Sequence, residues 1–192
     1  MSDKKKLNCS YDTEADMANA LKELMKAKSF EKISISDITN YCGMHRQTFY
    51  YHFVDKYELL EWIVHNELIL PLVNDFSLDN LYDKFTVMFD TMRAEKNFYQ
   101  SALKININEL FNYISNLATR QFSLLLNEIE RTNNIKSHNE NEIKMMSEFF
   151  GFGISGVILE WVHHGMKETP QEMVERIKSI INAIKNLAAS RI

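Results

Sequence analysis

Proline and glycine are scarce in this sequence, with two Pro and five Gly among 192 residues. Average usage is about 5% for Pro and about 7% for Gly, and both residues interrupt regular secondary structure. Hydrophobic residues, including 12 Phe and 10 Met, recur at intervals of three and four. The sequence therefore predicts an all-α protein, long enough to bury a core without disulfides or metals.

Cysteine and long apolar runs are also in short supply. Cys9 and Cys42 give neither a disulfide framework nor paired metal-ligand spacing, which fits a reducing compartment. The most apolar stretch, residues 149–162, contains three Gly, a Ser and a Glu, so it does not predict a membrane span. The amino terminus has no apolar segment of the kind that a secretion signal needs. We therefore expect a soluble, cytoplasmic protein that does not bind a membrane.

No set of residues predicts catalysis or a cofactor. The sequence has no Gly-rich phosphate loop, no nucleophile beside a base, and no pair of carboxylates on one helix face. His163 and His164 are adjacent, but neighbouring side chains on a helix point about 100° apart and no third ligand has suitable spacing. We therefore expect neither an enzyme, nor a metal site, nor a cofactor.

Charge is distributed unevenly along the chain. Residues 1–56 contain nine Lys and Arg against eight Asp and Glu, a net charge of +1. Residues 57–192 contain 13 against 18, a net charge of −5. Only the first segment is therefore suited to face the phosphates of a nucleic acid.

The spacing of apolar residues predicts a series of helices. They are expected at 11–28, 35–42, 46–53, 56–71, 81–92, 98–103, 107–130, 142–165 and 170–189. Asp12 or Thr13 can cap the first helix, and Thr169 with Pro170 can cap and open the last. The polar segment 132–141 is expected to be a loop.

The second and third helices have the signals of a helix-turn-helix unit. Ser34 to Asp37 has the spacing of a capping box, in which the Ser34 hydroxyl accepts a hydrogen bond from the Asp37 amide. Gly43 is the only glycine in the first 150 residues, and it lies between two short helices. A lone glycine there supplies the positive φ of a tight turn.

The third helix carries side chains suited to the DNA major groove. Arg46 can pair with guanine, and Gln47 can pair with adenine. Donors for phosphate oxygens are carried by Thr48, Tyr50, His52 and Lys56. The alternative is an aromatic core helix, which Phe49 and Phe53 fit, but the aromatic residues between them cannot all be buried with them.

Residues 34–60 contain five features in succession. They are the capped Ser-x-x-Asp-Ile motif, the Gly43 turn, the strings Thr-Phe-Tyr and His-Phe, and the string Asp-Lys-Tyr-Glu-Leu-Leu. This combination resembles the DNA-binding domain of TetR-type bacterial transcription regulators. The resemblance implies base contacts by Arg46, Gln47 and Tyr51. It implies phosphate contacts by Thr48, Tyr50, His52 and Lys56. We add Ser34 and Ser36, at the start of the second helix, to the expected DNA contacts.

The chain departs from this family's pattern at three positions. Ser29 stands where the family usually has Gly after its first helix, and Cys42 replaces a common Ala. His45 occupies the place of the usual Ser cap of the recognition helix. Two alternatives follow: the start of that helix is held less firmly than in the family, or His45 itself reaches the backbone of DNA.

The second half contains Gly-Val-Ile-Leu-Glu-Trp at 156–161, Gly165, and Thr-Pro-Gln-Glu-Met at 169–173. These residues are similar to the carboxy-terminal signature of the branch that includes dihydroxyacetone kinase regulators. The resemblance implies a DNA-binding domain at 1–55 and an effector-binding and dimerisation domain at 56–192. The effector can be a small molecule or a protein. The residues that we expect around a pocket are Met88, Met92, Phe111, Tyr113 and Trp161.

The last two helices are expected to form a dimer interface. The helix at 142–165 is apolar around its circumference, so it must be covered on several sides, and the last helix carries a matching apolar stripe. Two such helices from each protomer would form a four-helix bundle about a twofold axis.

The expected function is regulation of transcription by a homodimer on a pseudo-palindromic double-stranded DNA operator. Repression is the expected direction, under control of an effector in the second domain. The alternatives are an activator controlled by a protein partner, or a helical adaptor without DNA binding.

Overall fold

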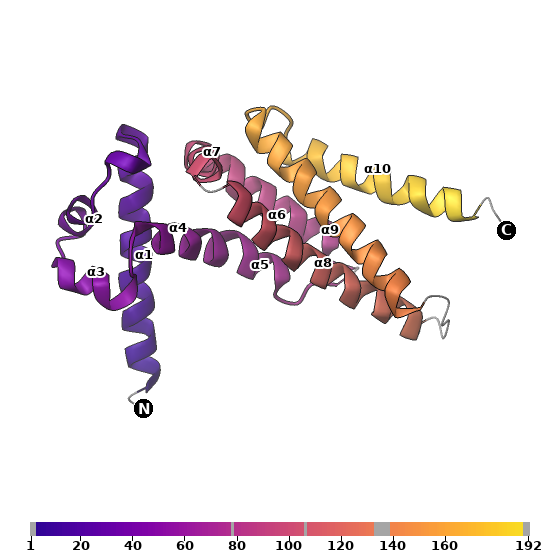
Figure 1. Ribbon diagram of the computed structural model, residues 1–192, viewed down its shortest axis with the longest axis horizontal. Helices are drawn as coiled ribbons and strands as arrows, with labels where there is room; N and C mark the ends of the chain where they lie inside the picture. Colours follow the sequence, from indigo (N-terminus) through magenta and orange to yellow (C-terminus); the bar gives the residue numbers. More distant parts are fainter. Residues whose placement is uncertain (1–2, 78, 106, 133–138, 190–192) are drawn as a thin grey trace. The chain divides into compact units, whose positions relative to one another are not determined.

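The computed structural model describes residues 3–77, 79–105, 107–132 and 139–189, and these residues form helices and no strand. The elements are α1 (Asp3–Ala27), the 3₁₀ turn η1 (Phe30–Lys32), α2 (Ile35–Tyr41), α3 (Arg46–His52), α4 (Lys56–Val64), the π-helical turn η2 (His65–Ile69), α5 (Leu70–Val73), α6 (Leu81–Ala94), α7 (Lys96–Ile105), α8 (Ile107–Thr132), α9 (Glu140–His163) and α10 (Pro170–Ala189) (Figure 1). The predicted all-α class is confirmed.

The helices divide into two compact units, Met1–Glu67 and Leu68–Ile192. The division expected from the sequence, after residue 55, would have assigned α4 to the second unit. In the structure α4 packs against α1 and buries Leu59 and Ile63 completely. Burial of this apolar face is what makes α4 a part of the first unit.

The first unit is built on α1, beside which α2 and α3 lie (Figure 1). Met17 and Leu21 of α1, Ile38 of α2 and Phe49 of α3 are all fully buried. The helix α1 begins at Asp3, earlier than predicted. Asp12 and Thr13 therefore lie within the helix and do not cap it, which corrects the expectation from the sequence.

The predicted capping box at the start of α2 is confirmed. The Asp37 amide donates to Ser34 Oγ over 3.1 Å, and the Ser34 amide donates to Asp37 Oδ2 over 2.8 Å. Lys28 Nζ lies 2.9 Å from the same carboxylate oxygen. The hydrogen bond from Lys28, followed by those from Ser34, holds the pKa of Asp37 well below its ordinary value.

Replacing Asp37 with asparagine is expected to lower the free energy of unfolding of the first unit at neutral pH. It should also make that free energy fall less steeply as the pH is lowered. A carboxyl with a lowered folded-state pKa stabilises the fold above its unfolded pKa, and that stability is lost as the pH falls below about 4. The measurement is urea unfolding of wild type and Asp37→Asn between pH 3 and 7. Equal pH dependence in the two proteins would contradict the role of the carboxylate.

The turn between α2 and α3 confirms the prediction for Gly43, whose φ is +68°. The Gly43 amide donates to Asn40 O over 3.2 Å, and the Met44 amide donates to Thr39 O over 2.8 Å. This pair of bonds is a Schellman motif, in which the left-handed residue after the helix directs the chain away. The turn therefore sets where α3 begins.

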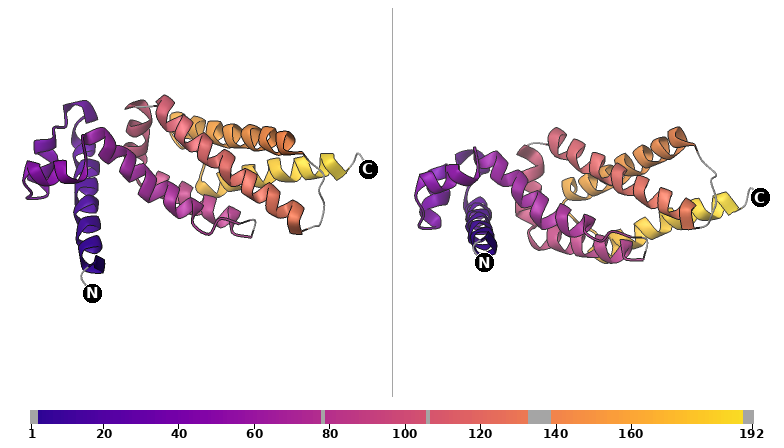
Figure 2. Two further views of the ribbon diagram at one scale, coloured as in Figure 1. Left: turned by 60° about the horizontal axis from the view of Figure 1, so that its bottom comes forward. Right: turned by 90° about the horizontal axis from the view of Figure 1, so that it is seen from below.

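In the second unit, α8 and α9 run side by side over most of their length (Figures 1 and 2). Ser147, Gly151 and Ser155 are buried at intervals of four on α9. A Cβ placed on Gly151 would lie 2.3 Å from Thr119 Oγ1 and 2.6 Å from the Thr119 amide nitrogen. The missing side chain of Gly151 therefore allows the backbones of α8 and α9 to approach closely.

The helix α10 packs against α6, with Met173 fully buried. Its predicted start is confirmed: the Glu172 amide donates to Thr169 Oγ1 over 3.2 Å, and Pro170 is the first helical residue. Figure 1 shows α9 and α10 diverging from the turn that joins them.

The helix α9 is the one described helix with the length and mean hydropathy of a membrane span, and 33% of its most apolar window is buried. One such helix is weak evidence of a membrane span, and α9 packs closely on α8 within the second unit.

Candidate nucleic-acid interface

The buried face of α3 is aromatic. Phe49 is fully buried, and its ring centre lies 5.7 Å from that of Phe53, which is also buried. Phe53 in turn lies 6.2 Å from Trp62 of α4, edge to face. The two Phe residues therefore belong to the core, as the interpretation of this segment required.

The opposite face of α3 is in solvent. Arg46 and Gln47 are exposed, and so are Tyr50 at 51% and Tyr51 at 85%. Arg46 Nη2 donates to the Tyr50 hydroxyl over 3.3 Å, and the guanidinium lies 6.0 Å from the centre of the Tyr50 ring. Arg46, Gln47 and Tyr51, to which base contacts were assigned, thus lie together at the surface.

The start of α3 lacks a side-chain cap. His45 is the N-cap residue, with extended backbone, and its exposed side chain makes no capping hydrogen bond. Thr48, on the first turn, is half-buried. Substitution of the family's usual Ser by His therefore leaves the amides of the first turn without a side-chain acceptor.

The two serines of α2 differ in what they offer to DNA. The Ser34 hydroxyl donates to Asp37 Oδ2 over 2.8 Å and accepts from the Asp37 amide, so it is committed to the cap. Ser36 is half-buried. DNA contact by either serine stays a prediction.

His52 has a structural partner. Its side chain is 8% exposed, and Nδ1 lies 3.2 Å from Glu14 Oε1 on α1. The interaction joins the end of α3 to α1 across 38 residues of sequence. Nδ1 is thus engaged within the fold, and phosphate contact by His52 stays a prediction.

Lys56 also has partners within the fold. Its ammonium donates to the carbonyl oxygens of Phe30, Glu31 and Ile33 over 2.8, 3.1 and 2.8 Å. It lies 4.6 Å from the centre of the Phe30 ring. An ammonium has three N–H donors, and all three are used here. Lys56 therefore holds α4 against η1, and phosphate contact by Lys56 stays a prediction.

One exposed aromatic residue was not anticipated. Tyr41 ends α2 just before the Gly43 turn, and it is 59% exposed. Its position next to the turn is visible in the sequence, but apolar spacing alone does not separate an exposed tyrosine from a buried one.

Two apolar cavities lie among the described residues of the second unit. The first, with a volume of about 60 Å³, is lined by residues of η2, α5, α6, α8 and α9, among them Met88 and Met92. The second, of about 190 Å³, is lined by residues of α6, α8, α9 and α10. The structure thus places two of the predicted pocket residues on a cavity wall.

The other three predicted pocket residues lie outside these walls. Trp161 is buried, with its indole N–H donating to Glu168 O over 3.1 Å and its ring 5.1 Å from that of Phe89. Phe111 lies against Phe152, with ring centres 6.0 Å apart, and Tyr113 is 42% exposed. Trp161 is therefore a core residue whose polar edge is already satisfied.

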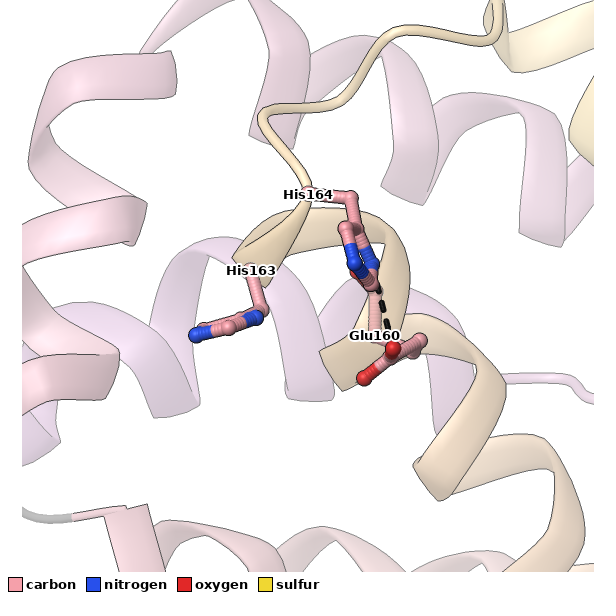
Figure 3. A group of neighbouring side chains, drawn as sticks. All are labelled: Glu160, His163 and His164. Carbon is pink, nitrogen blue, oxygen red and sulfur yellow. Dashed lines mark hydrogen bonds and ion pairs between the residues drawn. The ribbon is translucent and has the colours of Figure 1, made fainter.

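Figure 3 shows Glu160, His163 and His164 at the end of α9. Their possible ligand atoms lie within 4.8 Å of one another, so Glu160 supplies the third ligand that sequence spacing did not reveal. His164 Nδ1 pairs with Glu160 Oε1 at 3.1 Å, whereas the His163 ring points to the other side. All three side chains are exposed and lack the buried outer shell that usually orients metal ligands, so we assign no metal to them.

Comparisons with known proteins cover both units. Residues 19–63 match the family model described as bacterial regulatory proteins, tetR family. Residues 79–183 match the model of the TetR transcriptional regulator C-terminal region.

A curated relative and a solved structure carry the same name. The chain is 33% identical over 100 residues to the HTH-type dhaKLM operon transcriptional activator DhaS of Lactococcus lactis subsp. lactis (strain IL1403). That match covers 52% of this chain and 53% of the relative, so it spans about half the length of each. The solved structure of the dihydroxyacetone kinase operon activator DhaS has a TM-score of 0.73 at 21% identity, and the match covers 91% of this chain and 97% of that one.

The two family models together account for the helix-turn-helix unit and for most of the second unit. These matches agree with the exposed polar face of α3, the Gly43 turn and the capped start of α2. Both models describe regulators rather than enzymes. The chain belongs to the TetR family of bacterial transcription regulators.

Proposed function

We propose that this chain binds a pseudo-palindromic operator as a homodimer and reads base edges with α3. The observation that carries this proposal is the division of α3 into two faces. Phe49 is fully buried, while Arg46, Gln47 and Tyr51 extend into solvent from a helix that follows a tight turn. A helix with this arrangement can enter the major groove and still stay anchored to its own core.

A second copy of the chain is the proposed partner of α9. Met145 and Phe149 are each 74% exposed and Phe152 is 45% exposed, and the three lie on one face at spacings of four and three. Ile180 of α10 is 51% exposed. Large apolar side chains gathered in this way mark an interaction surface. Covering them with the same helices of a second protomer would give the expected four-helix bundle.

We propose that this chain activates transcription. The curated relative is named as a transcriptional activator of the dhaKLM operon, and the solved structure as a dihydroxyacetone kinase operon activator. Both names favour activation over the repression expected from the sequence. The cavities of the second unit are the proposed effector site. An effector that binds two arrangements of the dimer unequally would change operator affinity by that difference.

The experiment that tests DNA binding is fluorescence anisotropy with duplex DNA over a range of salt concentrations. A regulator that displaces counterions from phosphates should show a log affinity that falls linearly with log salt. An adaptor without DNA binding should give no signal even at low salt. The second result would contradict the proposal.

Replacing Arg46 with alanine is expected to lower affinity for a selected operator by about 1 to 3 kcal/mol and to relax the preference at one base pair. Tyr50→Phe, which removes only a hydroxyl, should weaken specific and random duplexes alike. The measurement is a titration of operator and random duplexes with each variant.

Arg131→Ala is the matched control for this prediction, because Arg131 is an exposed arginine at the end of α8. It should leave both affinities unchanged. If the Arg46→Ala protein keeps the base preference of wild type, Arg46 does not take part in base recognition.

A further inference from the structure

The two apolar cavities of the second unit adjoin one another. Phe85, Phe122 and Ile154 line both of them. The first cavity lies among η2, α5, α6, α8 and α9, and the second lies among α6, α8, α9 and α10. Because the two cavities share these three lining residues, we treat them as one candidate site, which we call the apolar channel.

The walls of the apolar channel offer very few hydrogen-bonding groups. The polar side chains among the lining residues are Gln121 and Ser155 in the first cavity and Arg176 in the second. Ser155 Oγ already donates to Gly151 O over 2.8 Å. Arg176 Nη1 is paired with Glu168 Oε1 at 2.6 Å, so its charge is compensated from outside the channel. Gln121 is the remaining polar side chain among the residues that line the first cavity.

These walls select against charged and strongly polar molecules. A carboxylate, phosphate or polyol entering the first cavity would lose its hydrogen bonds to water, and the walls of that cavity would not replace them. An uncharged hydrocarbon group meets no such cost and gains from leaving water. A single amide is sufficient to hydrogen-bond one hydroxyl or carbonyl group.

We propose that the apolar channel binds an uncharged, largely hydrocarbon effector that carries one hydrogen-bonding group, placed against Gln121. This inference rests on the proposed function, in which the second unit takes an effector. Phe149 and Ile180 line the channel and also belong to the surface assigned to the second copy. Occupancy of the channel is therefore placed to alter how α9 and α10 meet a partner protomer.

The test is isothermal titration calorimetry of the full chain, without DNA, against 1-hexanol, 1-octanol and 1-decanol, with octanoate and glycerol as polar comparisons. The alkanols should bind, with affinity rising about fourfold per added methylene. Octanoate should bind at least about tenfold more weakly than octanol, and glycerol should give no heat of binding. Equal or tighter binding of octanoate or glycerol, or no binding of any alkanol, would overturn the proposal.

Two variants locate the binding within the apolar channel. Ile154→Trp places a larger side chain on the wall shared by both cavities and should abolish alkanol binding, while circular dichroism reports whether the helices persist. If Ile154→Trp does not fold, Leu117→Phe in the first cavity makes a smaller change and should lower alkanol affinity. Gln121→Leu should lower affinity about 3- to 10-fold while keeping the increase per methylene. Unchanged alkanol affinity in a folded wall variant would place the binding elsewhere and contradict the proposal.

Failure of this proposal is distinguishable from failure of the proposed function. The calorimetry contains no DNA, so loss of operator recognition would leave its result unchanged. A protein that binds its operator but takes octanoate or glycerol in preference to octanol would overturn the ligand class alone.

Discussion

Replacing Gly151 with alanine is expected to destabilise the second unit by about 2 kcal/mol. An added Cβ would lie 2.3 Å from Thr119 Oγ1, 2.6 Å from the Thr119 amide nitrogen and 2.8 Å from its Cα. Two of these three atoms belong to the backbone of α8, so no side-chain rotation relieves the overlap. Overpacking of this kind costs about 1 to 3 kcal/mol or more, which exceeds the gain of about 1 kcal/mol that alanine has over glycine within a helix.

The controls for this prediction are Gly153→Ala and Gly156→Ala on the same helix. A Cβ at either position meets nothing within 4 Å, so helix propensity should decide and both variants should be more stable than wild type by about 0.5 to 1 kcal/mol. The measurement is urea unfolding followed by circular dichroism. A Gly151→Ala protein that gains stability as the controls do would contradict the close approach of α8 and α9.

Replacing Lys56 with methionine is expected to cost the first unit about 3 kcal/mol. The change removes three hydrogen bonds from a charged donor to the carbonyls of residues 30, 31 and 33, while it keeps most of the apolar volume. Because those bonds join α4 to η1, amide hydrogen exchange should accelerate in both elements. The measurement is urea unfolding combined with hydrogen exchange read residue by residue.

Lys32→Met is the control for Lys56, because Lys32 is an exposed lysine of η1 itself. It should change stability by less than about 0.5 kcal/mol. If Lys56 instead contacted phosphate, Lys56→Met would leave stability unchanged, weaken binding to every duplex, and reduce the salt dependence by about one counterion. That outcome would support the role implied by the family resemblance.

Local signals in the sequence predicted much of the fold. The capping box at Ser34, the turn at Gly43 and the cap at Thr169 each involve residues within a few positions of one another, and all three are present. Helix positions followed from apolar spacing, because burial of one face is repeated along each helix. The exposed and buried faces of α3 were predictable for the same reason.

Partners that are distant in the sequence could not be predicted in this way. Nothing near His52 or Lys56 indicates that His52 Nδ1 contacts Glu14, 38 residues away, or that the Lys56 ammonium donates to the carbonyls of η1, about 25 residues away. Gly151, Gly153 and Gly156 look alike in the sequence, yet only the first meets α8. Trp161 likewise could have lined a pocket until Glu168 O was seen to accept its N–H.

The central claim is that two copies of the chain place two α3 helices in successive major grooves of one duplex. Selection of bound sequences from a random pool of duplexes tests it most directly. The claim predicts recovery of an inverted repeat whose half-site centres are separated by about 10 base pairs, or about 34 Å, or by a multiple of that distance. Recovery of an unrepeated half-site, or of no preferred sequence at all, would contradict it.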